Sequence, residues 1–421
     1  MGQILLTFLT RVKPDKLAEL REFLDKDIAG NLLTNPYIPF LSLTRLHFAS
    51  LVLNEDATYG PYIVFENNFD GPLEAYLDEL YSHSAQGLHR IYGYCRDYPS
   101  GSAADREQIL SYLRKHIVRP NAYHIGNVGR SAKRTLREDG LRDGLENFLD
   151  DLVRTAPSGQ TAGSIRQKVQ DFVRSQPALA WATQAEPRQT EMERLRPWLN
   201  IAIVAVIALL LLPILIPIVF IWALVLRHKE KRDPAPDKFN INTHVKDLVE
   251  REDRTQVVQN HLAHMTLIKP GLFRRATLWI VLWLVNLVAR TQNHGKLLGI
   301  PSIHYAHWSM IDKGRRLLFV SNFDGSWENY LDDFIDKASF GLTAIWSNTR
   351  EFPRTLLLFW QGAKDGDRFK AWARDKQFYT NVWYSAYPSL TVETVDNNSA
   401  LREQLFTSLD ETATCEWLWR F

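Results

Sequence analysis

Hydrophobic and polar positions alternate near the start of the chain, and they alternate again after residue 259. In both places the alternation predicts a strand, over 6–14 and over 262–270, which ends at a Lys-Pro pair where a helix begins. A second and a third strand follow in each copy, and an Asp-Gly pair ends the third strand, at Asp70 and at Asp324. The chain therefore holds two copies of one pattern, with these aspartates 254 residues apart.

Each copy continues with the same order of elements. Helical spacing covers 72–93 in the first copy and 326–348 in the second, and Arg96 and Arg350 then stand in equivalent places before a fourth strand. The order strand, helix, strand, strand, helix, strand is that of a ferredoxin-like unit. Because the helices of such a unit cover one face of its sheet, we expect an α+β fold in which the two repeats pack sheet to sheet.

An uncharged apolar segment lies between the two copies. Residues 201–226 carry no charge over 26 positions, and basic side chains flank them on both sides. As a helix this segment would be about 39 Å long, whereas the hydrocarbon core of a bilayer is about 30 Å thick. We therefore expect a central membrane-inserted helical segment, with the alternative of a soluble core helix disfavoured by its length.

Two prolines, Pro213 and Pro217, fall inside the apolar segment and predict a bend there. A kinked single span and a bent hairpin both satisfy this pattern. A single span would place the two copies on opposite sides of the membrane, where their sheets could not cover each other. We therefore favour the hairpin, and the basic flanks favour the cytoplasmic side for the folded body.

The second copy carries another apolar helix, at 276–289, where the first copy has an amphipathic one. It is short for a membrane span, so we expect it to lie against the lipid, with Trp279 and Trp283 near the headgroups. A subunit interface is the alternative, because exposed apolar patches serve either purpose. Oligomer formation therefore stays open.

These patterns divide the chain into five parts. The expected divisions are a first ferredoxin-like repeat at 1–129, a helical connector at 130–197, the membrane segment at 198–228, a linker at 229–258 and a second repeat at 259–421.

The composition of the chain excludes several classes of function. Fifty basic and forty-eight acidic residues leave a formal charge of +2, so we expect no nucleic-acid partner. Two cysteines, Cys95 and Cys415, are too few for a disulfide framework or a cysteine-rich metal site, and we expect no metal. The chain has no P-loop, dinucleotide fingerprint, zincin motif or nucleophile elbow. Membrane lipid and a small apolar molecule are the expected partners.

The duplicated order of elements resembles the dimeric α+β barrel superfamily, over about 240 residues, and is distantly similar to dye-decolorising peroxidases. That resemblance implies a haem cofactor, with an aspartate and an arginine on its distal side. The family motif Gly-x-x-Asp-Gly appears here without its first glycine. The resemblance implies Asp324 with Arg350, and Asp70 with Arg96, as the catalytic groups.

A haem would also need an axial ligand, which is usually histidine. His304 and its counterpart His47 are the best-placed candidates, and Asn322 and Trp308 lie near them in the sequence as further cofactor-binding candidates. The alternative for the two aspartates is structural, because Asp before Gly at a helix start commonly accepts from the first amides of that helix.

Two hypotheses follow. The first is a membrane-anchored protein that binds a small apolar or haem-like ligand and acts as a peroxidase-like oxidoreductase. The second is a non-catalytic membrane-associated scaffold or interaction protein, in which the aspartates only cap helices.

Overall fold

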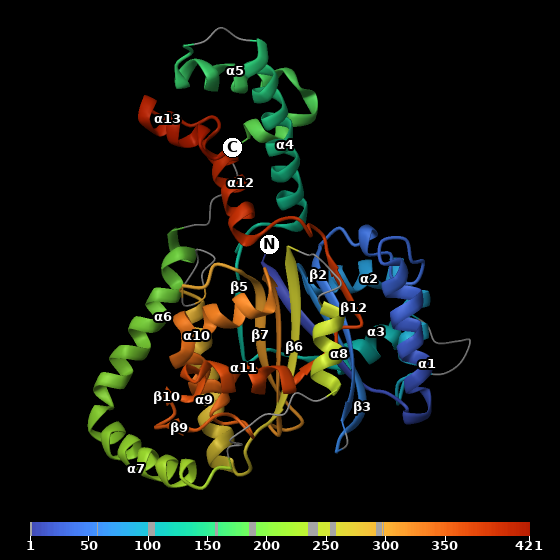
Figure 1. Cartoon of the computed structure of the whole chain (residues 1–421), viewed down its shortest axis with the longest axis vertical. Helices are drawn as coiled ribbons and strands as arrows, with labels where there is room; N and C mark the ends of the chain where they lie inside the picture. The colour runs from blue at the N-terminus through green and yellow to red at the C-terminus, as the bar shows by residue number, and fades with distance from the viewer. Residues whose placement is uncertain are drawn as a thin grey trace.

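The computed structural model describes residues 2–56, 58–99, 106–155, 159–184, 191–234, 243–252, 258–291, 297 and 299–421. Within this part of the chain, two antiparallel sheets of five strands each stand side by side, and helices lie around them (Figure 1). The predicted α+β class is confirmed. A two-stranded ribbon, β9 (Thr355–Leu356) with β10 (Trp360–Gln361), adds to the second half.

The first sheet has the strand order β12-β2-β3-β1-β4, and the second has the order β11-β6-β8-β7-β5. The strands of the first sheet are β1 (Gln3–Arg11), β2 (Leu46–Asp56), β3 (Gly60–Asp70), β4 (Ile117–Val118) and β12 (Val382–Ser385). Those of the second sheet are β6 (Gln259–Leu267), β7 (Ile303–Ile311), β8 (Arg316–Asp324), β11 (Gln377–Phe378) and β5 (Ala122–Ile125).

The two halves exchange their last strands. β5 belongs to the first half by sequence, yet it pairs with β7 of the second, where Ala122 lies opposite Trp308. In return β12 of the second half pairs with β2 of the first, where Val382 lies opposite Leu51. Each sheet therefore needs a strand from the other half to reach five strands.

Each sheet buries one face under helices and the other against its sister sheet. Phe8 and Phe65 point into the core under the first set of helices. The neighbouring Thr7 points the other way, and its hydroxyl lies 3.1 Å from His307 Nε2 of the second sheet. Val64 and Val320 share a smaller apolar cluster between the sheets. The strand alternation thus produces three apolar layers.

The covering helices follow the repeat. The first sheet is covered by α1 (Leu17–Glu22), α2 (Leu73–Gly93) and α3 (Arg106–Lys115), and the second by α9 (Leu272–Ala289), α10 (Trp327–Trp346) and α11 (Gly366–Asp375). Another helix, α8 (Thr243–Glu252), lies before β6 in the sequence.

A separate helical unit projects from one end of the sheets (Figure 1). It contains α4 (Ala132–Thr155), α5 (Ala162–Ser175), α12 (Val392–Gln404) and α13 (Glu411–Leu418), and we call it the helical head. Leu141, Val173, Leu401 and Trp417 form its core. The sequence divisions placed 130–197 apart from 259–421, whereas the structure joins helices from both into one unit.

The apolar segment forms two helices, α6 (Glu191–Leu210) and α7 (Leu212–Glu230). They meet at Leu211, two residues before Pro213, which lies in the first turn of α7. α6 runs along the second half and α7 turns beneath it, so that the two helices form an open corner (Figure 1). A closed hairpin within a bilayer stays a prediction.

Candidate functional site

The predicted histidines and aspartates come together as two equivalent pairs. His47 Nε2 lies 3.1 Å from Asp70 Oδ1, and His304 Nε2 lies 2.7 Å from Asp324 Oδ1. Both imidazoles are 1 % exposed. Each half thus joins its candidate histidine to its candidate aspartate, whereas the resemblance had implied an arginine as the partner of each aspartate.

The second oxygen of each aspartate accepts from a helix of the head. Asp70 Oδ2 accepts from the amide of Ala132 at 2.9 Å, and Asp324 Oδ2 accepts from the amide of Val392 at 2.8 Å. These amides are the first of α4 and α12.

The structural interpretation predicted that each aspartate caps the helix that directly follows its Asp-Gly pair. In the second half that helix is α10. The serine Ser326 caps α10 instead. The aspartates cap helices far along the chain, because the exchanged strands bring those helices back.

Two glutamines repeat the same connection. Gln3 Nε2 donates to the carbonyls of Asn127 and Arg130, at 3.2 and 2.9 Å, in the loop before α4. Gln259 Nε2 donates to the equivalent carbonyls of Tyr387 and Leu390 before α12. Each loop is thus held at the end of its sheet by one glutamine and one aspartate.

An aromatic cluster fills the space between the two His–Asp pairs. The ring of Phe48 lies 5.0 Å from that of His304, and the ring of Tyr305 lies 5.5 Å from that of His47. The Tyr387 hydroxyl is 2.8 Å from His47 Nδ1, so both ring nitrogens of His47 are engaged. An axial haem ligand needs a free imidazole nitrogen and an open face beside it. His47 therefore does not fit an axial ligand, and Nε2 of His304 is likewise engaged, by Asp324 at 2.7 Å and by Gln259 at 3.3 Å.

The two arginines lie at the other end of the sheets. The amide of Arg96 donates to Arg11 O at 2.8 Å, and Arg11 is the last residue of β1, whereas Asp70 pairs with Gln3 at its start. Eight residue steps of about 3.3 Å separate these ends by about 26 Å. Arg350 is placed in the same way, on Leu267 at the far end of β6 from Asp324. The expected pairing of these aspartates and arginines is absent.

The remaining predicted residues lie on two different faces of the second sheet. Trp308 is buried in the core under α10, 4.7 Å from the ring of Phe319, and its indole N–H has no hydrogen-bond partner. Asn322 lies on the opposite face, between the sheets, where its Oδ1 accepts from Trp383 Nε1 at 2.9 Å. Neither residue touches the His–Asp pairs through a hydrogen bond in the described structure.

Asn322 belongs instead to a polar cluster around Glu66, a residue that the sequence analysis did not single out. The Glu66 carboxylate is fully buried between the sheets. It lies 3.2 Å from His261 Nε2 and accepts from Asn68 at 3.0 Å, from Ser50 at 3.2 Å and from Asn322 at 3.4 Å. The cluster therefore connects β3 of the first sheet to β6 and β8 of the second.

The electrostatics of this cluster favour the carboxylate form. Burial alone would raise the pKa of Glu66, but the hydrogen bond and charge interaction with His261 outweigh it, and the pKa is lowered. Burial lowers the pKa of His307, whose Nδ1 is 3.6 Å from Glu66 Oε1. The cluster occurs once, because the equivalents of Glu66 and His261 in the other half are Val320 and Leu5. A lone acid directly after the apolar stretch 62–65 of β3 was the available sequence signal.

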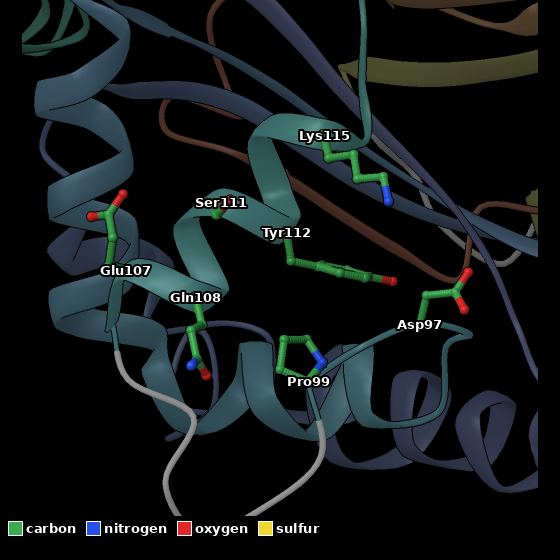
Figure 2. Close-up of a pocket in the computed structure, with 7 residues that line it drawn as sticks. All are labelled: Asp97, Pro99, Glu107, Gln108, Ser111, Tyr112 and Lys115. Carbon is green, nitrogen blue, oxygen red and sulfur yellow. The ribbon is translucent and has the colours of Figure 1, made fainter.

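The described residues form a surface hollow that lies away from the predicted site residues. No group of three His, Cys, Asp or Glu side chains in this part of the chain is arranged to hold a metal ion. A solvent-open hollow of about 490 Å³ lies beside α3, and Figure 2 shows the ring of Tyr112 pointing toward Asp97 in it. It is lined by Asp97, Pro99, Glu107, Gln108, Ser111, Tyr112 and Lys115. None of the predicted site residues lines this hollow.

The most unusual surface is apolar. α7 and α9 are long and apolar enough to cross a membrane, and only 6 % of the α7 window is buried in the protein, against 33 % of that of α9. Phe220 of α7 is 64 % exposed, and Trp279 of α9 is 55 % exposed. Trp222 joins the two helices through a 3.0 Å hydrogen bond to Thr277. We call the exposed side of α6, α7 and α9 the apolar surface.

Comparison with protein-family models, with curated proteins and with solved structures gave no match.

Proposed function

We propose that this chain is a non-catalytic, membrane-seated interaction protein. The paired sheets serve as a rigid body, the apolar surface rests in lipid, and the helical head extends from the other end of the molecule toward a partner (Figure 1). The strand orders support a duplicated ferredoxin-like barrel closed by the exchanged strands. Haem chemistry has little support, because His47 has no free nitrogen and the arginines lie far away.

The apolar surface carries this proposal. Side chains along α7 are more than half exposed, as at Ile216 (60 %), Phe220 (64 %) and Leu224 (56 %), and these three lie on one stripe of the helix. At about 25 cal/mol per Å², moving each such half-exposed side chain out of water contributes roughly 1 kcal/mol. Soluble proteins rarely leave so many neighbouring apolar side chains in water. A lipid bilayer is the occupant that the length of α6 and α7 and their basic flanks favour.

Flotation with neutral phosphatidylcholine vesicles tests the proposal. The full chain is expected to float with the vesicles and to resist extraction at high pH. A variant with Ile216→Asp, Phe220→Asp and Leu224→Asp places three charges on the lipid-facing stripe, at a cost of about 2.5–3.5 kcal/mol each in the bilayer. It is expected to stay in the dense fraction with an unchanged circular dichroism spectrum.

A matched control carries the same change on exposed apolar residues elsewhere. Leu33, Leu41 and Val153 are 56, 65 and 81 % exposed and lie outside the apolar surface. Their replacement by Asp is expected to leave flotation unchanged. Loss of flotation in the control, or normal flotation of the α7 variant, contradicts the proposal.

Equal protease access to both chain ends in sealed vesicles tests the same-side arrangement and its cytoplasmic orientation.

A further inference from the structure

Basic side chains gather where α7 ends and α9 begins. Lys229 Nζ lies 5.9 Å from the ring centroid of Phe273 in the first turn of α9. The next residue but one in α9, Arg275, donates to the carbonyl of Lys313 at 3.4 Å, in the turn between β7 and β8. We call this group the basic rim. Its members are Lys229, Lys231, Arg232, Arg275, Lys313 and Arg315.

The nearby acidic side chains are already engaged. Asp233 binds both Lys269 and Arg274, which lie buried beneath the rim. Asp312 binds Arg316. Among the described residues, no ion pair involves a member of the basic rim, and four of its members are exposed. The rim therefore presents unmatched positive charge to its surroundings.

The start of α9 adds to this charge. Its N-cap residue is Gly271, which supplies no side-chain cap, and its first turn contains no acidic residue. Arg274 and Arg275 stand there instead, although the partial positive charge of a helix start favours anions. The Nε and Nη1 groups of Arg274 have no hydrogen-bond partner among the described residues. An external anion would offset the charge that the helix start and the rim leave unmatched.

We propose that the basic rim binds the net negative headgroups of anionic lipids, an inference that rests on the proposed membrane seating. The rim borders the apolar surface directly, since Leu272, which is 78 % exposed, adjoins Phe273, and Lys229 lies in the last turn of the apolar helix α7. Cations at the edge of a lipid-facing surface lie at the depth of the headgroups. This position favours a lipid phosphate over a soluble one. Each exposed Lys or Arg is expected to strengthen binding roughly fivefold.

The test uses the full chain in neutral maltoside micelles, titrated with fluorescent phosphatidylserine or phosphatidylcholine and followed by anisotropy. The rim variant carries Arg232→Gln, Lys313→Gln and Arg315→Gln. Three residues at roughly fivefold each predict that the Kd for phosphatidylserine rises about 100-fold, while the weak binding of phosphatidylcholine does not change. The binding of phosphatidylserine is expected to weaken with added salt.

The control variant removes the same charge from exposed cations away from the rim, with Arg119→Gln, Lys133→Gln and Arg137→Gln. It is expected to bind phosphatidylserine as the unchanged chain does. An equal loss in the control, equal affinity for both lipids, or full displacement of phosphatidylserine by millimolar inorganic phosphate overturns the proposal. If the chain still floats with neutral vesicles in that case, the membrane seating stands and only the lipid preference falls.

Discussion

The buried Glu66 cluster gives the sharpest test of how the two halves are joined. Replacing Glu66 with Val removes the acceptor for His261, Asn68, Ser50 and Asn322 at once. A buried donor left without a partner costs about 1–3 kcal/mol, and loss of one member of a buried ion pair costs about 3–5 kcal/mol. Since the four donors relax together, we expect a total loss of about 3–5 kcal/mol in the free energy of unfolding.

The molecule supplies its own apolar replacement for this cluster. The second half carries Val320 and the first half carries Leu5 at the positions equivalent to Glu66 and His261. The double variant Glu66→Val with His261→Leu removes both partners of the pair, so it is expected to be more stable than Glu66→Val alone by about 1–2 kcal/mol. Glu66→Gln keeps the volume and one acceptor, and is expected to lose about 1–2 kcal/mol.

Urea unfolding in micelles, followed by tryptophan fluorescence and circular dichroism, measures these differences. The pH dependence is a second readout. Because the folded pKa of Glu66 is lowered, its stabilisation is present above the unfolded value and is lost as the pH falls through the folded pKa. The Glu66→Val chain should lack this component of acid sensitivity. Either of two results would refute this account of the cluster. One is an unchanged unfolding midpoint for Glu66→Val. The other is a double variant whose loss in the free energy of unfolding exceeds the summed losses of the two single variants.

Three further predictions concern the head, the histidines and the glycines. Because Asp324 accepts from the first amide of α12, Asp324→Ala should lower the free energy of unfolding by about 1–2 kcal/mol and speed amide hydrogen exchange in that helix. Asp324→Asn should retain part of the protection against exchange. Burial lowers the pKa of His124 to about 4 and that of His264 to about 3. The free energy of unfolding should therefore fall as the pH drops below about 6.5, and His264→Leu should make this fall less steep. Gly87→Ala should lower the melting temperature, because its Cβ would lie 2.2 Å from a backbone oxygen, whereas Gly140→Ala in open space should raise it slightly.

The sequence predicted what depends on local periodicity. The third strand expected at 316–323 is β8 at Arg316–Asp324, and the helix expected at 326–348 is α10 at Trp327–Trp346. Strand alternation and helical spacing are properties of neighbouring residues, so one chain reveals them. The repeat also singled out His47 and Asp70, but it did not predict that they pair with each other at one end of the first sheet.

The sequence could not predict what depends on distant contacts. β5 has only four residues, and its partner β7 begins almost 180 residues later, so nothing local marks the exchange. The head was missed for the same reason, because α4 and α12 are joined only through space. The roles of Asp70 and Asp324 followed from that exchange. Arg96 and Arg350 failed as their partners because equal sequence spacing does not place residues at the same end of a strand.

The exchanged strands also govern how the chain can be completed during synthesis. The edge of β2 stays open until residues 382–385, which are made long after β2 itself, leave the ribosome. At about 5–20 residues per second, that wait is on the order of tens of seconds. An unpaired edge is a template for association with other chains. A nascent polypeptide that emerges beside a membrane would therefore gain most from a chaperone that protects its first half until β12 has been made.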